Sequence, residues 1–434
     1  MPTLIPALAG RPLTQIVAAG NACAALDEQG QLWTWGSSSR GVLGHPGSGN
    51  SGDNQTAATT AAGAAAGAVV TQPALVSALI GRRLIHVALS ETHGAAVELL
   101  ADGSTQVLSW GTKALGFPAP PPSADRPGGS KVATSRGARD IRDTSFNTIT
   151  SPSVALLPQV VPALAGKHIV AVACGLKHTL ALSATGEVFS CGSDREGALG
   201  LGDTLPRVEP ELISALRGVR IVAVGAGNGS SLFVDSDGRV YSAGSNEKGQ
   251  AGTGSAQRRY LTPQAIPGLS QIKQVAVGAL HALAVDTQGR AYSWGWNAEG
   301  QGGLGDRSLE HRFPLQINLG QTNSSSSTQR QSASAASSSP SASSASPAPS
   351  VTHVSAGFGH SVVVTSDGAL WACGRGREGQ LGRGDQLESV AAGRESPVRS
   401  KFFEERGYQV VAAAAGADFT LALIKEDATK QQTR

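Results

Sequence analysis

Residues 169–182 read IVAVACGLKHTLAL, and residues 186–192, after a short turn, read GEVFSCG. Both segments consist of runs of five to seven residues that are apolar throughout or at alternate positions and end at glycine-containing turns. Such runs between glycine-rich turns are typical of β-strands. The stretch from Ile169 to Gly192 therefore predicts three successive strands joined by two tight turns.

The same stretch is repeated along the whole chain. The first element occurs in seven copies, and the second, which ends in a closing glycine, follows six of them. A third element, a proline followed by alternating apolar residues, comes next, as in PELISAL from Pro210. The closing glycines of three middle copies, Gly192, Gly244 and Gly295, are 52 and 51 residues apart, and Gly374 closes a later copy. The repeat unit is therefore about 51 residues long and contains four strands.

Four antiparallel strands in one repeat unit are the signature of a β-propeller blade. One such sheet cannot bury both of its faces alone, whereas a ring of sheets buries each face against a neighbour. We therefore expect a single all-β domain over residues 1–434, a seven-bladed β-propeller.

The two ends of the chain are expected to meet in the last blade. The seventh copy stops after Leu423, whereas residues 3–16, TLIPALAGRPLTQI, match the end of a repeat. We therefore predict that the N-terminus adds an outer strand to the blade begun at the C-terminus, so that N- and C-terminal strands close the ring. Since the second element is missing from this blade, either the blade has three strands or residues upstream of Met1 were lost. We favour the second explanation.

The amino-acid composition indicates which segments lie outside the folded repeats and argues against some classes of function. Residues 45–71, 117–157 and 320–350 are rich in small and polar residues and predict disordered loops, and residues 426–434 predict a flexible tail.

The net charge of +3, with no run of five basic residues, argues against nucleic-acid binding. No apolar run reaches about 18 residues, so no membrane span is expected. The four cysteines form no Cys-x-x-Cys pair, which favours a reducing, intracellular compartment.

The repeat resembles a known family. The order of ACGLKHTLAL (173–182), GEVFSCGSDREGALGLGD (186–203) and a following proline with apolar residues is similar to the RCC1 repeat, named for regulator of chromosome condensation 1. WD40 repeats end in Trp-Asp and are shorter, and kelch repeats carry a Gly-Gly pair that does not recur here. The resemblance implies an RCC1-type propeller with seven blades, the last one incomplete if the second element is truly absent.

The resemblance leaves three functions open. The one we favour is a monomeric, non-catalytic platform that binds a protein partner, because propeller rims present many loops on a rigid ring. The first alternative is guanine-nucleotide exchange on a Ran-like small GTPase, as in the founding member of the family. The second alternative is a mitochondrial assembly factor. The corresponding compartments are the cytoplasm or nucleus, or the mitochondrion, although residues 1–20 lack the arginine-rich character of a presequence.

Histidines recur at one position of the repeat. Four first turns carry His93, His178, His281 and His360, and we place Cys23, Ser230 and Phe419 at the same position in the others. Such histidines could be general bases or metal ligands, or their nitrogens could satisfy buried backbone groups. We favour the structural role, because one histidine per blade spreads the four around a ring.

Exposed charges provide the candidate partner-binding residues. Aspartates after the glycine-rich loop, Asp203, Asp306 and Asp385, are expected to cap turns and could offer a charged rim. The insert at 117–157 could act as a wedge on a GTPase through Arg139, Asp140, Arg142 and Asp143. Three Gly-x-Gly-x-x-Gly stretches, at 47–52, 300–305 and 374–379, lie in loops rather than between a strand and a helix, so no cofactor is expected.

Overall fold

The computed structural model describes residues 2–37, 41–45, 69–111, 157–193, 195–306, 308–320, 349–382 and 394–426. The predicted disordered loops and the tail fall mainly outside these residues. At their edges the prediction was too long: Val69 begins a strand that includes residues 69–71, and Glu426 still belongs to the last strand.

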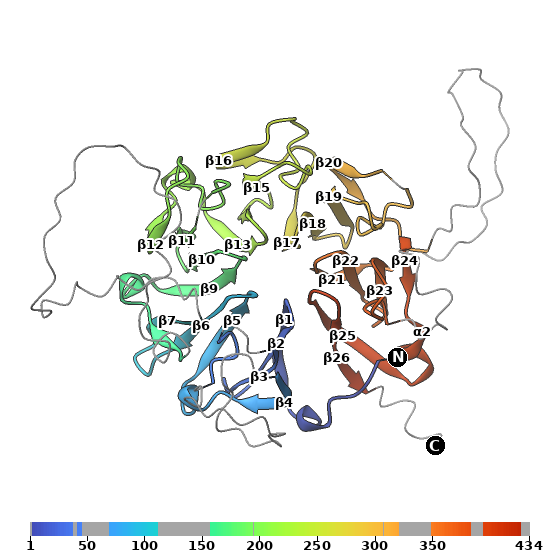
Figure 1. Cartoon of the computed structure of the whole chain (residues 1–434), viewed down its shortest axis with the longest axis horizontal. Coiled ribbons are helices and arrows are strands. Elements are labelled where there is room, and N and C mark those ends of the chain that lie inside the picture. Colours follow the sequence, from blue (N-terminus) through green and yellow to red (C-terminus); the bar gives the residue numbers. More distant parts are fainter. Residues whose placement is uncertain are drawn as a thin grey trace, which may run out of the picture.

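The described chain forms six four-stranded antiparallel sheets and one two-stranded sheet, arranged as a ring (Figure 1). From the innermost strand outward, the first three sheets contain β1 (Leu13–Ala19), β2 (Ala22–Asp27), β3 (Leu32–Ser37) and β4 (Val69–Leu75); β5 (Leu84–Leu89), β6 (His93–Leu99), β7 (Thr105–Gly111) and β8 (Gln159–Val160); β9 (Ile169–Cys174), β10 (His178–Ser183), β11 (Val188–Gly192) and β12 (Arg207–Leu212).

The next three sheets contain β13 (Ile221–Ala226), β14 (Ser230–Asp235), β15 (Val240–Ser245) and β16 (Arg259–Ala265); β17 (Ile272–Val277), β18 (His281–Asp286), β19 (Ala291–Trp296) and β20 (Glu310–Gln316); β21 (Val351–Ala356), β22 (His360–Thr365), β23 (Leu370–Gly374) and β24 (Arg394–Arg399). The two-stranded sheet consists of β25 (Tyr408–Ala415) and β26 (Thr420–Glu426). The all-β propeller is confirmed, but the count of seven blades was wrong. Six blades are complete, and the seventh unit has two strands among the described residues.

Short helical turns connect most of the blades. They are η1 (Pro6–Leu8), η2 (Ser77–Leu79), η3 (Pro162–Leu164), η4 (Ser214–Leu216) and, before β25, the helix α2 (Lys401–Glu405). The apolar cores lie between adjacent blades rather than within one sheet. For example, Val97 and Val107 of the second blade pack with Val172 and Phe189 of the third. This arrangement is why the sheets are stable only as a ring.

The ends of the chain meet differently from the prediction. Residues 3–16 do not form an outer strand: they contain η1, and residues 13–16 belong to β1, the innermost strand of the first blade. The ring is closed instead by a backbone hydrogen bond from Ala417 N–H to the Gly20 carbonyl, 2.9 Å long. Side chains of the N-terminal segment and of β26 also join one apolar cluster there. Within the described ranges, no helix is long and apolar enough to cross a membrane.

Candidate functional site

The seven turns between first and second strands surround a cavity of about 250 Å³ on the axis of the ring. Each unit contributes three consecutive residues to its wall, so all seven units meet at this cavity. The lining segments are 18–20, 89–91, 174–176, 226–228, 277–279, 356–358 and 415–417.

The glycines of these turns are required by close approach between neighbouring units. A Cβ on Gly175 would lie 2.6 Å from the Gly227 carbonyl oxygen, and a Cβ on Gly227 would lie 2.5 Å from that of Gly278. In the same way, a Cβ on Gly278 would lie 2.5 Å from the Gly357 carbonyl oxygen, and a Cβ on Gly357 would lie 2.4 Å from that of Gly416. Any side chain there would push two units apart, so the glycines set the width of the axial cavity.

The four repeat histidines bridge neighbouring blades. Each Nε2 lies 2.8–3.0 Å from a hydroxyl oxygen in the next unit, and the pairs are His93–Thr179, His178–Ser231, His281–Ser361 and His360–Thr420. Ser231, Ser361 and Thr420 donate their hydroxyl protons to backbone carbonyls, so each of these oxygens accepts from the histidine N–H. The partner is thus a side-chain hydroxyl rather than the backbone group that we expected.

Three of these histidines, His178, His281 and His360, are held in the neutral form. Burial lowers the pKa of His178 and of His360 to about 4, and burial with the nearby His360 lowers the pKa of His281 to about 3. In the part of the chain that the structure describes, no group of three His, Cys, Asp or Glu side chains is placed to hold a metal ion. The four rings lie in four different blades and do not converge on one site.

The strand register corrects the residue assigned to the histidine position of the first unit, and it shows how this position is related to the facing residue of the next unit. Ala22, not Cys23, pairs with a closing glycine as His178 does, so Ala22 occupies the histidine position of the first unit. Where a unit has histidine, the next unit has serine or threonine at the facing position. Where a unit lacks histidine, the facing residue of the next unit has no hydroxyl group, as in the pairs Ala22–Gly94, Ser230–Ala282 and Phe419–Cys23.

A second contact between blades follows the same rule. The glycine-rich loops after the third strands are hereafter called exit loops, and among the described residues five of them offer a carbonyl to the next blade. Ser231, Ser361 and Thr420 donate to the carbonyls of Ala198, Gln301 and Gln380 over 2.7–2.8 Å. Where the facing residue is Gly94 or Ala282, the indole N–H of Trp110 or Trp294 donates instead, to Val42 or Gln250. Tryptophan and hydroxyl are thus alternative donors to one acceptor.

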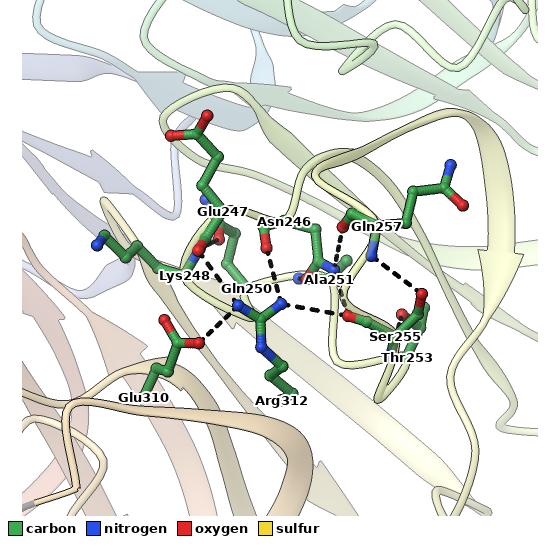
Figure 2. Close-up of polar contacts among 10 residues, drawn as sticks. All are labelled: Asn246, Glu247, Lys248, Gln250, Ala251, Thr253, Ser255, Gln257, Glu310 and Arg312. Carbon is green, nitrogen blue, oxygen red and sulfur yellow. Dashed lines mark hydrogen bonds and ion pairs between the residues drawn. The ribbon is translucent and has the colours of Figure 1, made fainter.

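The exit loops are held rigidly, as Figure 2 shows for the loop after β15. The Asn246 side chain donates to the Ser255 and Gln257 carbonyls, and the Gln250 amide oxygen accepts from Lys248 N–H. Arg312 reaches in from β20 of the next blade, where it pairs with Glu310 over 2.6 Å and donates to the Ser255 carbonyl. The loop after β15 is therefore shaped by its own amide side chains and by the following blade.

The predicted aspartates shape their own loops. Asp203 accepts two hydrogen bonds from Arg207 and one from Leu205 N–H, and the bonds from Arg207 are the main reason that the pKa of Asp203 lies below its usual value. Asp306 accepts from the Asn297 side chain and contacts His311 Nε2 at 3.1 Å. Both carboxylates remain about 40% exposed, at 40% and 42%. Asp385 and the predicted wedge residues Arg139, Asp140, Arg142 and Asp143 lie outside the described residues.

Sequence reasoning missed the aromatic residue beside the axial cavity. Phe358, in the turn between β21 and β22, lines the cavity and is 46% exposed. Its N–H donates to the Gly416 carbonyl of the next unit, and Arg375 pairs with Asp418 over 3.5 Å near the same turns. The only signal was a phenylalanine in a turn where the other units carry Gly, Glu, Leu, Asn or Ala. We call the axial cavity, the seven turns and the exit loops the turn face.

Comparisons with known proteins agree on the repeat. Residues 1–338 match the family described as RCC1-like domain, and residues 367–423 match the regulator of chromosome condensation (RCC1) repeat. The chain is 32% identical over 272 residues to the ultraviolet-B receptor UVR8 of Arabidopsis thaliana, which covers 62% of the chain and 54% of the receptor. It is 30% identical over 241 residues to the probable E3 ubiquitin-protein ligase HERC6 of Homo sapiens, over 53% of the chain and 21% of the ligase. The chain therefore spans about half of the first relative and about a fifth of the second.

Two solved structures share the fold over nearly the whole chain. Human WBSCR16 superposes with a TM-score of 0.68 at 20% identity, over 96% of this chain and 88% of that one. Prp20p of Saccharomyces cerevisiae gives a TM-score of 0.69 at 20% identity, over 99% of this chain and 86% of that one. With the family match over residues 1–338, the repeated strands and the ring of turns identify this chain as a member of the RCC1-like family.

Proposed function

We propose that this protein is an interaction platform that binds a protein partner on its turn face. The observation that carries the proposal is Phe358, an aromatic side chain left 46% exposed beside the axial cavity. Aromatic residues beside a recess are typical centres of protein interfaces, because a partner can bury a large apolar area there at little entropic cost. The turns that hold Phe358 are fixed on both sides by neighbouring units, so the surface is already ordered before binding.

We propose that charged groups of the exit loops form the rim of this interface. Asp203 and Asp306 are anchored by their own loops yet remain about 40% exposed. A carboxylate that is already oriented can meet a basic group on a partner without a further loss of side-chain freedom. We therefore propose that both aspartates contribute to specificity and association rate more than to affinity.

The test is the partner affinity of two matched variants. A partner is first captured with the intact protein, identified and purified, and its dissociation constant is then measured by calorimetry. Phe358→Ala should weaken binding by about tenfold or more. Ile80→Ala, which removes a 59% exposed isoleucine from the connection between β4 and β5, should change it by less than about threefold. Equal affinities of the two variants would remove the turn face from the proposal.

Guanine-nucleotide exchange on a Ran-like GTPase is the second candidate. It is supported by the fold match to Prp20p, whose structure was described together with its binding to Gsp1p and histones. At 20% identity the similarity to Prp20p supports a shared fold but not a shared activity. Release of labelled GDP from purified small GTPases, followed by stopped flow, decides between the two. Acceleration at catalytic amounts of this protein would replace the platform with an exchange factor.

A further inference from the structure

The end of the ring opposite the turn face is formed by the starts of the innermost strands. The strands β1, β5, β9, β13, β17, β21 and β25 surround the axis, and each of them ends at the turn face (Figure 1). Their first residues therefore lie at the other end of the axis, about 17–20 Å away for a strand of six residues. Neighbouring innermost strands contact one another around the ring, so their first residues lie side by side.

Each innermost strand carries a β-bulge close to its start. The pairing with the second strand passes from Ile169 to Ala171 in β9 and from Ile221 to Ala223 in β13, which leaves one residue between them unpaired. A bulge turns the side chain of its extra residue out of the regular sheet. All seven extra residues are exposed. They are Thr14, Ile85, Val170, Val222, Lys273, Thr352 and Val411.

Four of the seven bulge residues are exposed aliphatic side chains. They are Ile85, Val170, Val222 and Val411, each 40–48% exposed. None of the four belongs to an apolar cluster of the described residues, whereas their neighbours do: Ile169 packs toward the second blade and Ala171 toward the fourth. The fold also accepts threonine and lysine at this position, as at Thr352 and Lys273. Packing within the ring therefore does not account for the aliphatic residues.

Basic residues surround three of the four aliphatic side chains. Ile85, Val170 and Val222 belong to three consecutive blades, the second to the fourth. The connections that lead into β5, β9 and β13 lie at the same end of the ring, and so does the start of β17. Together they present five exposed basic side chains, Arg83, Lys167, Arg217, Arg220 and Lys273. We call these five residues, with Ile85, Val170 and Val222, the far rim.

Positive charge is in excess at the far rim, because other charges nearby are paired or held within their own turns. The pairs are Arg82–Glu98, Arg239–Asp237 and Arg290–Asp286, at 2.7, 3.3 and 2.6 Å. Asp102 and Glu187 are exposed and accept hydrogen bonds from hydroxyls of their own turns, and Asp235 is buried. Among the described residues, no acidic side chain pairs with the five basic ones, although Lys167 lies over the Phe189 ring at 5.7 Å.

This combination favours an acidic protein segment over a membrane or a nucleic acid. Carboxylates are attracted by the basic groups, and an aliphatic side chain between them would cover the exposed valines. The aliphatic side chains of the far rim are more than half covered by the protein, so they cannot insert into the acyl region of a bilayer. Phosphates of a nucleic acid would be repelled by Asp102 and Glu187, which lie among the basic groups.

We propose that the far rim is a second binding site, and that it takes an acidic segment of a partner protein with an apolar side chain between its carboxylates. The segments of this chain that follow β20 and β26 at the same end, residues 321–348 and 427–434, contain a single acidic residue, Asp427. They therefore lack the charge that the far rim would bind. A partner there lies at the opposite end of the ring from the turn face, so the platform would hold two partners at once.

The probe is a fluorescein-labelled peptide of sequence EDDLIEDDE, whose affinity for the full-length chain is measured by fluorescence anisotropy. Two control peptides remove one feature each: EDDSSEDDE lacks the apolar pair, and QNNLIQNNQ lacks the charges. We expect saturable binding of the first peptide and binding at least about fivefold weaker for each control. Raising the salt from about 0.05 M to about 0.5 M should weaken the first peptide, because the exposed charges are then screened.

Arg220→Glu and Lys401→Glu test the charge of the far rim as a matched pair. Both substitutions change the net charge equally at an exposed residue in a connection between two units. Lys401, however, begins α2 between the sixth blade and the seventh unit, outside the far rim. Arg220→Glu should weaken the acidic peptide by about tenfold or more, and Lys401→Glu by less than about threefold.

Val170→Thr combined with Val222→Thr tests the aliphatic part, and Val411→Thr is its control from the seventh unit. Threonine keeps the shape of valine and already holds the bulge position at Thr14 and Thr352, so the ring should stay folded, which circular dichroism checks. The double variant should weaken the peptide by about fivefold, and Val411→Thr by less than about twofold.

Three outcomes would overturn the proposal. The first is the absence of saturable binding at millimolar peptide, and the second is an equal effect of Arg220→Glu and Lys401→Glu. The third is tighter binding to phosphatidylserine vesicles or to a DNA duplex that Arg220→Glu and the double valine variant both abolish, which would assign the far rim to a membrane or a nucleic acid. None of these measurements involves Phe358, so failure here is distinguishable from failure of the turn-face proposal.

Discussion

The bridge between His281 and Ser361 shows how a single residue pair joins two blades. The imidazole N–H meets the serine oxygen at 2.9 Å, and the serine proton goes to the Gln301 carbonyl at 2.7 Å. All three groups are buried, so loss of the hydroxyl leaves the imidazole N–H without a partner and the Gln301 carbonyl with only the Cys373 thiol, whose sulfur lies 3.5 Å away. The chain itself contains an apolar alternative, because Phe419 and Cys23 hold the same two positions at the closure of the ring.

Ser361→Ala should lower the free energy of unfolding by about 1–3 kcal/mol, because it leaves the buried imidazole N–H of His281 unsatisfied. Adding His281→Phe removes the unpaired imidazole, so the double variant should lose less than the sum of the two single variants. Urea unfolding of all four proteins gives the coupling energy. Strict additivity would show that the histidine and the hydroxyl do not act as a pair.

Acid should weaken the ring through the same histidines. Their pKa values in the folded protein, about 4 for His178 and His360 and about 3 for His281, lie below the ordinary value near 6.5. Between these limits the unfolded chain binds more protons than the folded one, so stability is present above pH 6.5 and falls as the pH drops toward 4. At pH 5 the loss is about 2 kcal/mol per histidine.

The measurement is urea unfolding at pH 7 and pH 5. The wild type should lose stability on acidification, and the His281→Phe, Ser361→Ala variant should lose about 2 kcal/mol less. An identical loss in both proteins would assign the pH dependence to other groups.

At the scale of the element, the exit loop and the following blade are joined through one carbonyl. Trp294 donates to the Gln250 carbonyl over 2.9 Å because Ala282 offers no hydroxyl there. In the neighbouring blades a serine at the facing position makes this bond. The loop after β15 is further tied to the next blade by Arg312 (Figure 2), so both contacts fix the surface that a partner would meet.

Trp294→Phe should destabilise the protein by about 2–4 kcal/mol, through the lost indole bond and the smaller ring. Adding Ala282→Ser supplies a hydroxyl in the position of Ser231 and Ser361, and it should restore part of the lost stability. Thermal unfolding measures the effect, and Ala282→Ser in the wild-type background is the control. No rescue would show that hydroxyl and indole are not alternative donors.

At the scale of the whole molecule, the ring is closed by contacts that differ from those between the other blades. The closure rests on Ala417 N–H, the apolar cluster around Leu8 and Phe419, and a unit with two strands among the described residues. With fewer strands and half-buried side chains at this position, the closure should be the weakest point of the ring.

Phe419→Ala should therefore open the ring before it unfolds the blades. Hydrogen exchange should become faster at β1, β2, β25 and β26, while the amides of β14 and β18 stay protected. Exchange resolved by mass spectrometry on proteolytic fragments tests this order. Uniform acceleration in all blades would show that the ring opens and unfolds in a single cooperative step.

Much of this fold could be predicted from local sequence. Strand alternation, Asp-Gly turns and the interval between Gly192 and Gly244 gave the four-stranded unit, because hairpin pairing depends on neighbouring residues. The count of seven blades was wrong, since seven copies of a first strand do not reveal how many sheets are completed. The contacts of the four histidines also escaped prediction, although their partners follow a visible rule: serine or threonine stands at the facing position of the next repeat.

The sequence by itself determined the repeated strands, the turns and the family, because these depend on short-range patterns that recur in every unit. Only the tertiary structure decided how the units meet: which carbonyl each hydroxyl or indole reaches, and how close the turns come at the axis. Those contacts join residues 33 or more positions apart in the chain, and at the closure nearly 400, as between Gly20 and Ala417. Their geometry exists only once the ring has formed.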